Sequence, residues 1–275
     1  IIYENDNGIL NNVSNKIAPE LEDFGIVNKI VTTDFDNDGW EDFIVVGEWT
    51  HIGIFKNNEG VFKDISEKSN LNNLFGWWFN IQETDINNDG LKDYVVGNIG
   101  SNIKFKTSAE KPLRIYADDF DNNGTHDLVL SYEYENKYVP LRGKECSTQQ
   151  MPFIAEKIPT FTEFANASLQ DIYGEKINTS YMREVTDLKS YILINNGDSS
   201  FKKIKLPDLA QTIPILSSDV FDYNKDGYED IIVSGNIYNT EVETPRLDNP
   251  FALVLLSNKK DGYYCLSPNT TGLYT

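Results

Sequence analysis

The sequence predicts an all-β fold of repeated four-stranded antiparallel units, and three observations lead to this prediction. Short runs of β-branched and aromatic residues recur along the chain, separated by Asn- and Gly-rich turns. One acidic nine-residue pattern occurs four times, each time directly before an apolar run. A regular unit takes roughly fifty residues, which is the size of one β-propeller blade, so we expect a β-propeller with about five blade units in this chain.

The first copy of the acidic pattern occupies residues 34–42 and precedes the run Phe43-Ile44-Val45-Val46. Side-chain oxygens stand at positions 1, 3, 5 and 9, and a glycine at position 6 allows a sharp turn. This density of oxygen ligands favours Ca²⁺, because Mg²⁺ usually keeps more of its water. An EF-hand is excluded, since position 12 holds Val45 instead of a bidentate Glu and a strand-like run follows instead of a helix. The pattern predicts a calcium loop that leads into a strand.

We call the four copies loop one (34–42), loop two (85–93), loop three (119–127) and loop four (222–230). Each has an apolar residue at position 2, Gly at position 6 and Asp at position 9. The expected ligands are the side chains at positions 1, 3, 5 and 9 and the backbone carbonyl at position 7. The predicted ligands of up to four Ca²⁺ ions are Asp34, Asp36, Asp38, Trp40, Asp42, Asp85, Asn87, Asp89, Leu91, Asp93, Asp119, Asp121, Asn123, Thr125, Asp127, Asp222, Asn224, Asp226, Tyr228 and Asp230.

The elements of the first unit follow one another in a fixed order. One strand enters loop one, a second leaves it, and a hairpin with an Asn-Asn-Glu-Gly turn joins the third strand to the fourth. A further strand then enters loop two. The expected strands are residues 1–3, 30–32, 43–49, 52–55, 61–65 and 79–82, with turns at 5–8 and 57–60.

The spacing between loops changes along the chain. The unit between loops two and three is short, and a loop around residues 103–112 is expected to replace its hairpin. The unit between loops three and four is long, and capping-box patterns at 147–150 and 160–163 predict a helical insertion over residues 143–188. We expect this unit to resume with strands at 191–194 and 201–204. A last unit is expected to use residues 231–233, 251–256 and 263–265, and residues 1–275 are expected to form a single domain.

Composition limits the classes of partner. The chain has 275 residues and a formal net charge of −19, so nucleic acid is a poor partner because no basic face can displace its counterions. No apolar run approaches the roughly 18–20 residues of a membrane helix, so no membrane-spanning segment is expected. Because the chain opens in mid-pattern without Met, we interpret it as part of a larger multidomain chain. Pairing of Cys146 with Cys265 stays open at this stage.

The acidic loops between short strands resemble the FG-GAP/VCBS repeats of integrin-α-like β-propellers. Longer segments are similar to the bacterial relatives of cartilage acidic protein, which carry this propeller beside an ASPIC/UnbV module that this segment does not contain. The resemblance implies a calcium-bearing propeller, secreted or exposed at the outer cell surface, with no established catalytic residues. Asn87, Asn123 and Asn224 depart from an all-Asp pattern, which concerns affinity because Asn still supplies a neutral carbonyl ligand. The similar segments are residues 17–21, 45–49, 76–78, 96–100, 150–153, 235–236 and 240–244.

Three functions are compatible with these observations. We favour a binding or adhesion scaffold with structural calcium and a protein or glycan ligand, which is not an enzyme. The first alternative is a carbohydrate-active hydrolase or lyase with paired carboxylates, but the calcium loops already use nearly every suggestive Asp. His51 and His126 also have no nucleophile or base at motif spacing. The second alternative is a lectin-like glycan binder in which Trp49, Trp77 and Trp78 stack on sugars.

Overall fold

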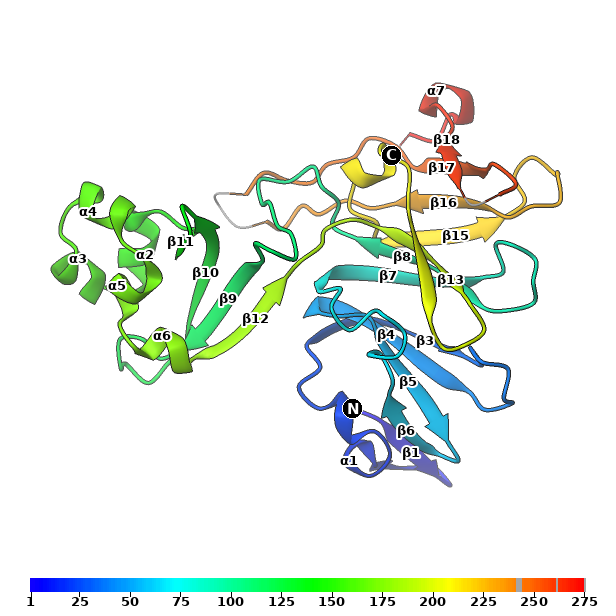
Figure 1. The fold of residues 1–275 in the computed structure, drawn as a ribbon, viewed down its shortest axis with the longest axis horizontal. Coiled ribbons are helices and arrows are strands. Elements are labelled where there is room, and N and C mark those ends of the chain that lie inside the picture. Colours follow the sequence, from blue (N-terminus) through cyan, green and yellow to red (C-terminus); the bar gives the residue numbers. More distant parts are fainter. Residues whose placement is uncertain (241–243, 261, 275) are drawn as a thin grey trace. The chain divides into compact units, whose positions relative to one another are not determined.

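The computed structural model describes residues 1–240, 244–260 and 262–274. The chain forms two compact units, which are described separately (Figure 1). Unit 1 comprises Ile1–Lys104 and Leu188–Thr275, and unit 2 comprises Phe105–Asp187. The paired strands of both units are antiparallel, which agrees with the all-β prediction and fits a β-propeller-like fold.

Unit 1 contains three four-stranded sheets, each in the order expected for a blade. The first sheet holds β3 (Ile26–Thr33), β4 (Asp42–Thr50), β5 (Gly53–Asn58) and β6 (Val61–Asp64). The second holds β7 (Gly76–Thr84), β8 (Asp93–Asn98), β13 (Tyr191–Asn195) and β14 (Phe201–Lys205). The third holds β15 (Ser217–Phe221), β16 (Asp230–Ser234), β17 (Leu253–Ser257) and β18 (Tyr263–Cys265). A short pairing of β4 with β7 joins the first two sheets into one eight-stranded sheet.

The central strands of these sheets are apolar on both faces because each face packs against a different core. Ile44 and Val46 of β4 belong to a cluster shared with the second sheet, whereas Phe43 and Val45 face a cluster with Phe55. A further cluster lies between the second and third sheets, and it includes Val95, Ile192, Ile215, Ile231 and Leu253. Full burial of one such side chain contributes about 1.5–3 kcal/mol. This explains why continuous apolar runs, rather than alternating ones, follow the acidic loops.

Two glycines allow close backbone contacts around the third sheet. A Cβ atom on Gly97 of β8 would lie 2.3 Å from the carbonyl oxygen of Ile215, in the segment that leads into β15. A Cβ on Gly235, which follows β16, would lie equally close to the carbonyl oxygen of Pro214, in the segment that precedes β15 of the same sheet. Only a residue without a side chain fits at these two positions, so Gly97 allows backbone contact between the second and third sheets, and Gly235 allows it within the third.

Unit 2 is a four-stranded sheet accompanied by five short helices. The strands are β9 (Leu113–Asp118), β10 (Asp127–Tyr134), β11 (Lys137–Pro140) and β12 (Tyr181–Val185), in the order β11-β10-β9-β12. The helices are α2 (Lys144–Gln150), α3 (Phe153–Lys157), α4 (Phe161–Asn166), α5 (Leu169–Tyr173) and α6 (Lys176–Thr179). Phe120, Val129, Met151, Ile154 and Ile172 belong to one core, which ties the helices to loop three and β10.

Two local predictions for the helices have different outcomes. Thr160 caps α4 in the expected capping box with Glu163, and the two side chains exchange hydrogen bonds with each other's backbone N–H groups. The capping box predicted at residues 147–150 is wrong, because α2 already begins at Lys144 and Ser147 lies inside it. A second capping box, Ser168 with Asp171, starts α5.

The connectivity of the long unit differs from the prediction. Residues 191–194 were expected to continue the sheet that follows loop three, but β13 pairs with β8 of the sheet that follows loop two (Figure 1). Unit 2 is therefore inserted in sequence between the second and third strands of that sheet. The predicted helical insertion, residues 143–188, includes all the helices from α2 to α6 together with β12. An apolar strand can pair with many others, so the order of the strands along the chain did not predict which of them pair here.

The remaining elements are short. The hairpin of β1 (Tyr3–Asp6) and β2 (Ile9–Asn12) is exposed throughout, and Asn7 and Gly8 have positive φ in its predicted turn. The other elements are α1 (Ser14–Ile17), the 3₁₀ helices η1 (Pro19–Leu21) and η2 (Ala210–Thr212), and α7 (Pro268–Thr271). Residues 241–243, which belong to one segment of the family resemblance, lie outside the described residues.

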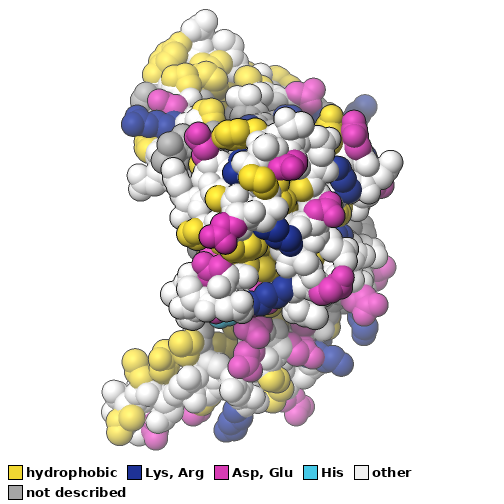
Figure 2. Space-filling view, turned by 90° about the vertical axis from the view of Figure 1, so that its left-hand side faces the viewer, with side chains coloured by type: hydrophobic (Ala, Val, Ile, Leu, Met, Phe, Trp, Pro, Cys, Tyr) yellow, Lys and Arg dark blue, Asp and Glu magenta, His cyan; other side chains and the backbone are white. Residues whose placement is uncertain are grey.

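Two surface properties bear on the predicted partners. Within the described part of the chain, no helix is long and apolar enough to cross a membrane. Figure 2 shows one face of the molecule, on which acidic side chains are interspersed with basic and hydrophobic ones. The net negative charge of the chain is therefore not gathered into a single acidic field on that face.

Candidate metal centre

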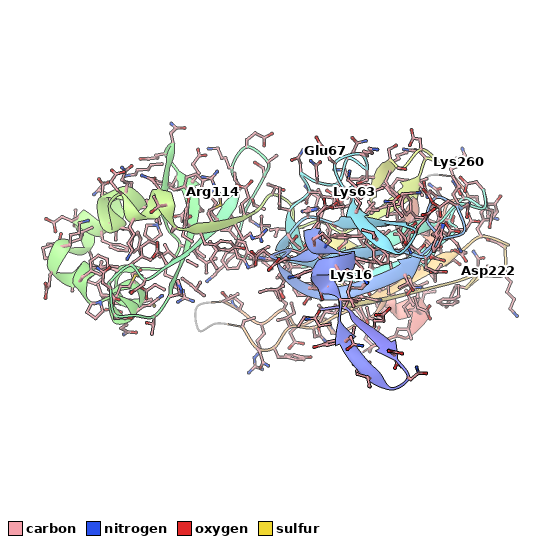
Figure 3. The ribbon with its side chains drawn as sticks, turned by 90° about the horizontal axis from the view of Figure 1, so that it is seen from below. Lys16, Lys63, Glu67, Arg114, Asp222 and Lys260 are labelled. Carbon is pink, nitrogen blue, oxygen red and sulfur yellow. The ribbon has the colours of Figure 1, made fainter. Side chains whose placement is uncertain are left out.

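All four acidic loops fold around the carboxylate at position 1. In each loop this carboxylate accepts one hydrogen bond from the backbone N–H at position 5 and one from the glycine N–H at position 6. The N···O distances lie between 2.9 and 3.1 Å. The position-5 side chain in turn accepts from the N–H at position 7, at 2.8 to 3.0 Å. The four position-1 residues are Asp34, Asp85, Asp119 and Asp222, of which Asp222 is labelled in Figure 3.

The backbone of each loop turns through the left-handed region twice. Position 4 has φ between 57° and 60°, and the glycine at position 6 has φ between 85° and 89°. Asn tolerates this region better than most residues, and Gly adopts it without a Cβ clash. The residues at position 4 are Asn37, Asn88, Asn122 and Lys225. The motif pattern predicted the role of the glycine, but the need for a left-handed residue at position 4 is visible only in the structure.

The aspartate at position 9 is buried in every loop, at 4% exposure or less. In unit 1 its Oδ1 accepts a hydrogen bond from a backbone N–H at or near the end of the third strand of the same sheet. The donors are Asn57 at 2.7 Å, Asn195 at 2.8 Å and Ser257 at 2.9 Å. In loop three the side chain of Gln150 takes this place, at 3.4 Å from Asp127 Oδ1. Position 9 therefore fastens the loop to its sheet, a role that spacing within the motif could not reveal.

The structure brings together carboxylates from positions 1, 3 and 9 in two of the loops. In loop one the oxygens of Asp34, Asp36 and Asp42 lie within 4.8 Å of one another, and loop three has the same arrangement. The loop-three residues are Asp119, Asp121 and Asp127. Oxygens at such separations can share one cation, since Ca²⁺–O distances are about 2.3–2.6 Å.

In loops two, three and four an asparagine amide joins positions 3 and 5. Asn87 donates to Asp89, Asn123 to Asp121, and Asn224 to Asp226, at 2.8 to 3.0 Å. The amide nitrogens therefore donate to the carboxylates, and the amide oxygens accept hydrogen bonds from backbone N–H groups of the loop. The carbonyls of Trp40, Leu91, Thr125 and Tyr228 stay predicted ligands.

Loop one has the chemistry that best fits a cation. Asp36 Oδ1 and Asp42 Oδ2 are buried and accept no hydrogen bond of normal geometry from the described residues. Burial raises the pKa of Asp42 to about 6, and it raises that of Asp93 in loop two to about 6 as well. The pKa of Asp127 in loop three is also raised by burial. A bound cation would favour the ionised form of each of these carboxyls, and in loop one it would also supply a partner for Asp36 Oδ1 and Asp42 Oδ2.

Lysine amines stand beside three of the loops. Lys56 Nζ contacts the carboxylates of Asp36 and Asp38, the latter at 2.7 Å. Burial acts to lower the pKa of Lys56, but the hydrogen bonds to these two carboxylates outweigh it and raise the pKa above its usual value. Lys176 Nζ bonds Asn122 Oδ1 in loop three, at 3.1 Å, and Lys259 Nζ lies 3.2 Å from Asp226 in loop four. These ammonium groups neutralise part of the loop charge.

Hydrogen bonds also link three loops of unit 1 to one another. The backbone N–H of Asn195 donates to Asp93 of loop two, and its side chain donates to the Phe35 carbonyl of loop one at 2.7 Å. Glu229 of loop four accepts hydrogen bonds from Thr84 and from the backbone N–H of Asp85 in loop two. A change in one loop can therefore reach the next through a single side chain.

The other candidate residues lie away from these loops or are buried. His51 sits 3.6 Å from Asp64 and packs edge-on against Phe24 and Phe75. Trp77 and Trp78 are buried, with Trp78 wholly inaccessible, so they serve as core residues and offer no exposed face for a sugar. Trp49 packs edge-on against Trp77.

These features define a class of protein: antiparallel sheets whose first two strands are joined by oxygen-rich acidic loops, as in repeats of a β-propeller-like fold. Residues 34–96, which include loops one and two, match the family model of the FG-GAP-like repeat. A comparison with curated proteins found no match.

Among solved structures, the chain is similar to one described as the recognition of non-reducing terminal N-acetylglucosamine by an Agrocybe aegerita lectin. The sequence identity is 16%, and the alignment covers 86% of this chain and 65% of the lectin chain. The TM-score is 0.19, which is too low to establish a common fold.

Proposed function

We propose that this chain is a calcium-binding β-propeller scaffold in which Ca²⁺ is structural, with up to four sites in loops one to four. The observation that carries the proposal is the pair of buried, unpartnered oxygens on Asp36 and Asp42, within reach of Asp34. Asp42 is buried and Asp36 is half-buried, and two carboxylates at this separation repel one another unless a proton or a cation lies between them. The repeated backbone of the other three loops extends the proposal to them.

The finer family assignment belongs to the same proposal. The FG-GAP-like match covers residues 34–96, and we extend it to a propeller of about five blade units, close to bacterial relatives of cartilage acidic protein. From that relationship we infer a secreted or cell-surface protein that belongs to a larger multidomain chain. Its role would be to present a protein or glycan ligand surface, without catalysis.

The residues of each loop have separate parts in this function. The position-1 carboxylate closes the turn through two backbone N–H groups, and the position-9 carboxylate fastens it to the third strand. Bound Ca²⁺ would supply the positive charge that lets these carboxylates stay ionised while buried. Since the ion binds the folded loop and not the open one, its binding free energy adds to folding stability.

Chelation tests this proposal. The protein is melted with excess EDTA, then with excess Ca²⁺ or Mg²⁺, while elemental analysis reports the metal content. We expect the melting temperature to fall by many degrees in EDTA and to return with Ca²⁺ more than with Mg²⁺. An unchanged melting curve after the metal has been removed would contradict a structural role.

A matched pair of variants locates the effect. Asp36→Asn should reduce the calcium content by about one ion or weaken its binding, because Asp36 supplies one of the buried oxygens of loop one. Asp198→Asn changes an aspartate of the β13–β14 turn that accepts hydrogen bonds from Ser200 and lies outside the four loops, and it serves as the control. Equal calcium binding by both variants and the parent would remove loop one from the proposal.

Carbohydrate binding is the second candidate function. It is favoured by one observation, a cavity of unit 2 lined by arginine, lysine and tyrosine side chains.

A further inference from the structure

Unit 2 contains a cavity of about 520 Å³ between one face of its sheet and helices α5 and α6. Strands β9, β11 and β12 contribute its floor, and the segment from Ser168 to Ser180 contributes its wall. The volume lies within the range of about 300–1,000 Å³ that is usual for small-molecule sites. The cavity belongs to the part of the chain that interrupts a regular sheet, and none of the four loops lines it.

The charge of the cavity is opposite to that of the chain. Arg114 and Lys137 both line it, and none of its lining residues is Asp or Glu. The chain as a whole carries a formal net charge of −19. Glu184 pairs with Arg114 and offsets part of this charge, while Lys137 and the remaining guanidinium N–H groups of Arg114 still favour an anionic ligand in the cavity.

Arg114 is held in place by its neighbours. Its Nε lies 3.3 Å from Glu184 Oε2, and its guanidinium carbon lies 4.2 Å from the centre of the Tyr138 ring. A guanidinium carries five N–H donors in a planar fork, which is more than the contact with Glu184 can use and which matches a carboxylate in a bidentate manner. Figure 3 labels Arg114 on the sheet of unit 2. Lys137 is anchored as well, since its Nζ donates to the Asn166 carbonyl at 2.5 Å.

The opposite wall offers acceptors for hydroxyl groups. The amide nitrogens of Gln170 and Asn178 both donate to the carboxylate of Glu175, at 2.7 and 3.0 Å. These bonds orient the two amide groups and leave the amide oxygens as the acceptors that a ligand hydroxyl can meet. Tyr116 adds a half-buried aromatic surface beside Arg114, of the kind that packs against the C–H face of a sugar ring.

We propose that this cavity binds a sugar acid, with its carboxylate on Arg114 and Lys137 and its hydroxyl groups on Gln170 and Asn178. The inference goes beyond the calcium scaffold and does not depend on it, because the cavity shares no lining residue with the four loops. A free hexuronic acid and a hexuronic acid at the end of a polysaccharide present the same chemistry to such a site.

Calorimetric titration of the full chain in saturating Ca²⁺ tests the proposal. The probes are glucuronate and galacturonate, with glucose and galactose as neutral counterparts and inorganic phosphate as a simple anion. We expect at least one hexuronate to bind at least about tenfold more tightly than its neutral hexose and than phosphate. No hexuronate binding at roughly 10 mM, or equal binding of phosphate, would overturn the assignment.

Three variants identify the site. Arg114→Gln and Lys137→Gln should each weaken hexuronate binding by about tenfold, because each removes a charge-assisted hydrogen bond. Lys111→Gln removes the same charge from an exposed side chain of unit 2 outside the cavity and should leave the affinity unchanged. Lys137→Gln keeps the test valid if Arg114→Gln fails to fold. Hexuronate affinity that is unchanged in a folded Lys137→Gln protein would overturn the proposal.

A melt of the same proteins separates this inference from the calcium proposal. Weaker hexuronate binding in Lys137→Gln, with the same EDTA effect on its melting temperature as in the parent, would support the cavity proposal independently of the calcium proposal. Hexuronate binding by a protein whose melting temperature EDTA leaves unchanged would refute only the calcium scaffold.

Discussion

Substitution of Asp42 by Asn should change the pH dependence of stability in a way that the burial of this carboxyl predicts. Burial raises its pKa from 3.8 to about 6 in the calcium-free fold. Because the folded-state pKa is the higher one, the favourable contribution of Asp42 is complete below pH 3.8 and is lost as the pH rises through 6. A shift of about two units corresponds to about 3 kcal/mol, at about 1.36 kcal/mol per unit. Asp42 is only 1% exposed, so solvent screening hardly reduces this figure.

The measurement is urea unfolding of the parent and of Asp42→Asn in EDTA, at about pH 4.5 and at about pH 7.5. Part of the Asp42 contribution has already been lost at the lower pH, so the free energy of unfolding of the parent should fall by about 2 kcal/mol between the two pH values. Asn cannot ionise, and the variant should therefore gain about 2 kcal/mol relative to the parent on going to the higher pH. Asp6→Asn, in the exposed β1–β2 hairpin, is the control and should show no such gain. A stability difference between parent and Asp42→Asn that is the same at both pH values in EDTA would refute the reasoning. In saturating Ca²⁺ the sign should reverse at the higher pH, because the variant loses a ligand.

Further predictions follow from single contacts. Lys56→Met should tighten Ca²⁺ binding at loop one about tenfold, because it removes an ammonium that competes for Asp36 and Asp38. Lys63→Met, at an exposed position of β6, is the control and should leave the affinity unchanged. Equal Ca²⁺ affinities of the two variants in calorimetric titration would contradict this prediction. Asn195→Ala should lower the free energy of unfolding by about 1–3 kcal/mol, since it leaves the buried Phe35 carbonyl without its donor. Asn196→Ala removes an exposed hydrogen bond to Ser200 and should cost far less in the same urea titration. Gly97→Ala should lower the free energy of unfolding by about 3 kcal/mol or more, because the new Cβ would meet the Ile215 carbonyl. Gly143→Ala is the control, since a Cβ there meets nothing within 4 Å. Similar melting temperatures for the two variants would argue against the close sheet packing.

The features that could be predicted from the sequence are those that depend on residues close together in the chain. The acidic loops were identified because their turn needs Gly at position 6 and oxygens at alternate positions, and both requirements are visible locally. The Thr160 cap was identified for the same reason. The partners of the position-9 aspartates were not, because Asn57, Asn195 and Ser257 donate backbone N–H groups, and every residue except proline has one.

Strand pairing was the other property that the sequence did not reveal. The pairing of β13 with β8 depends on packing of Ile192 and Val95 in one core, and many apolar strands of the chain could satisfy that demand equally well. Likewise, the cavity of unit 2 combines Arg114 and Lys137 with lining residues between Ser168 and Met182, so no local sequence motif indicates it.

The hydrogen bond between Asp93 and Asn195 joins residues that are 102 positions apart. As the chain leaves the ribosome, β7 and β8 must wait with an open edge until all of unit 2 has been made. Unit 2 depends on contacts of shorter range and has time to fold during this delay. A pause in synthesis or a truncation before Tyr191 would therefore leave the edge of β8 that pairs with β13 open, and an open strand edge is prone to aggregation.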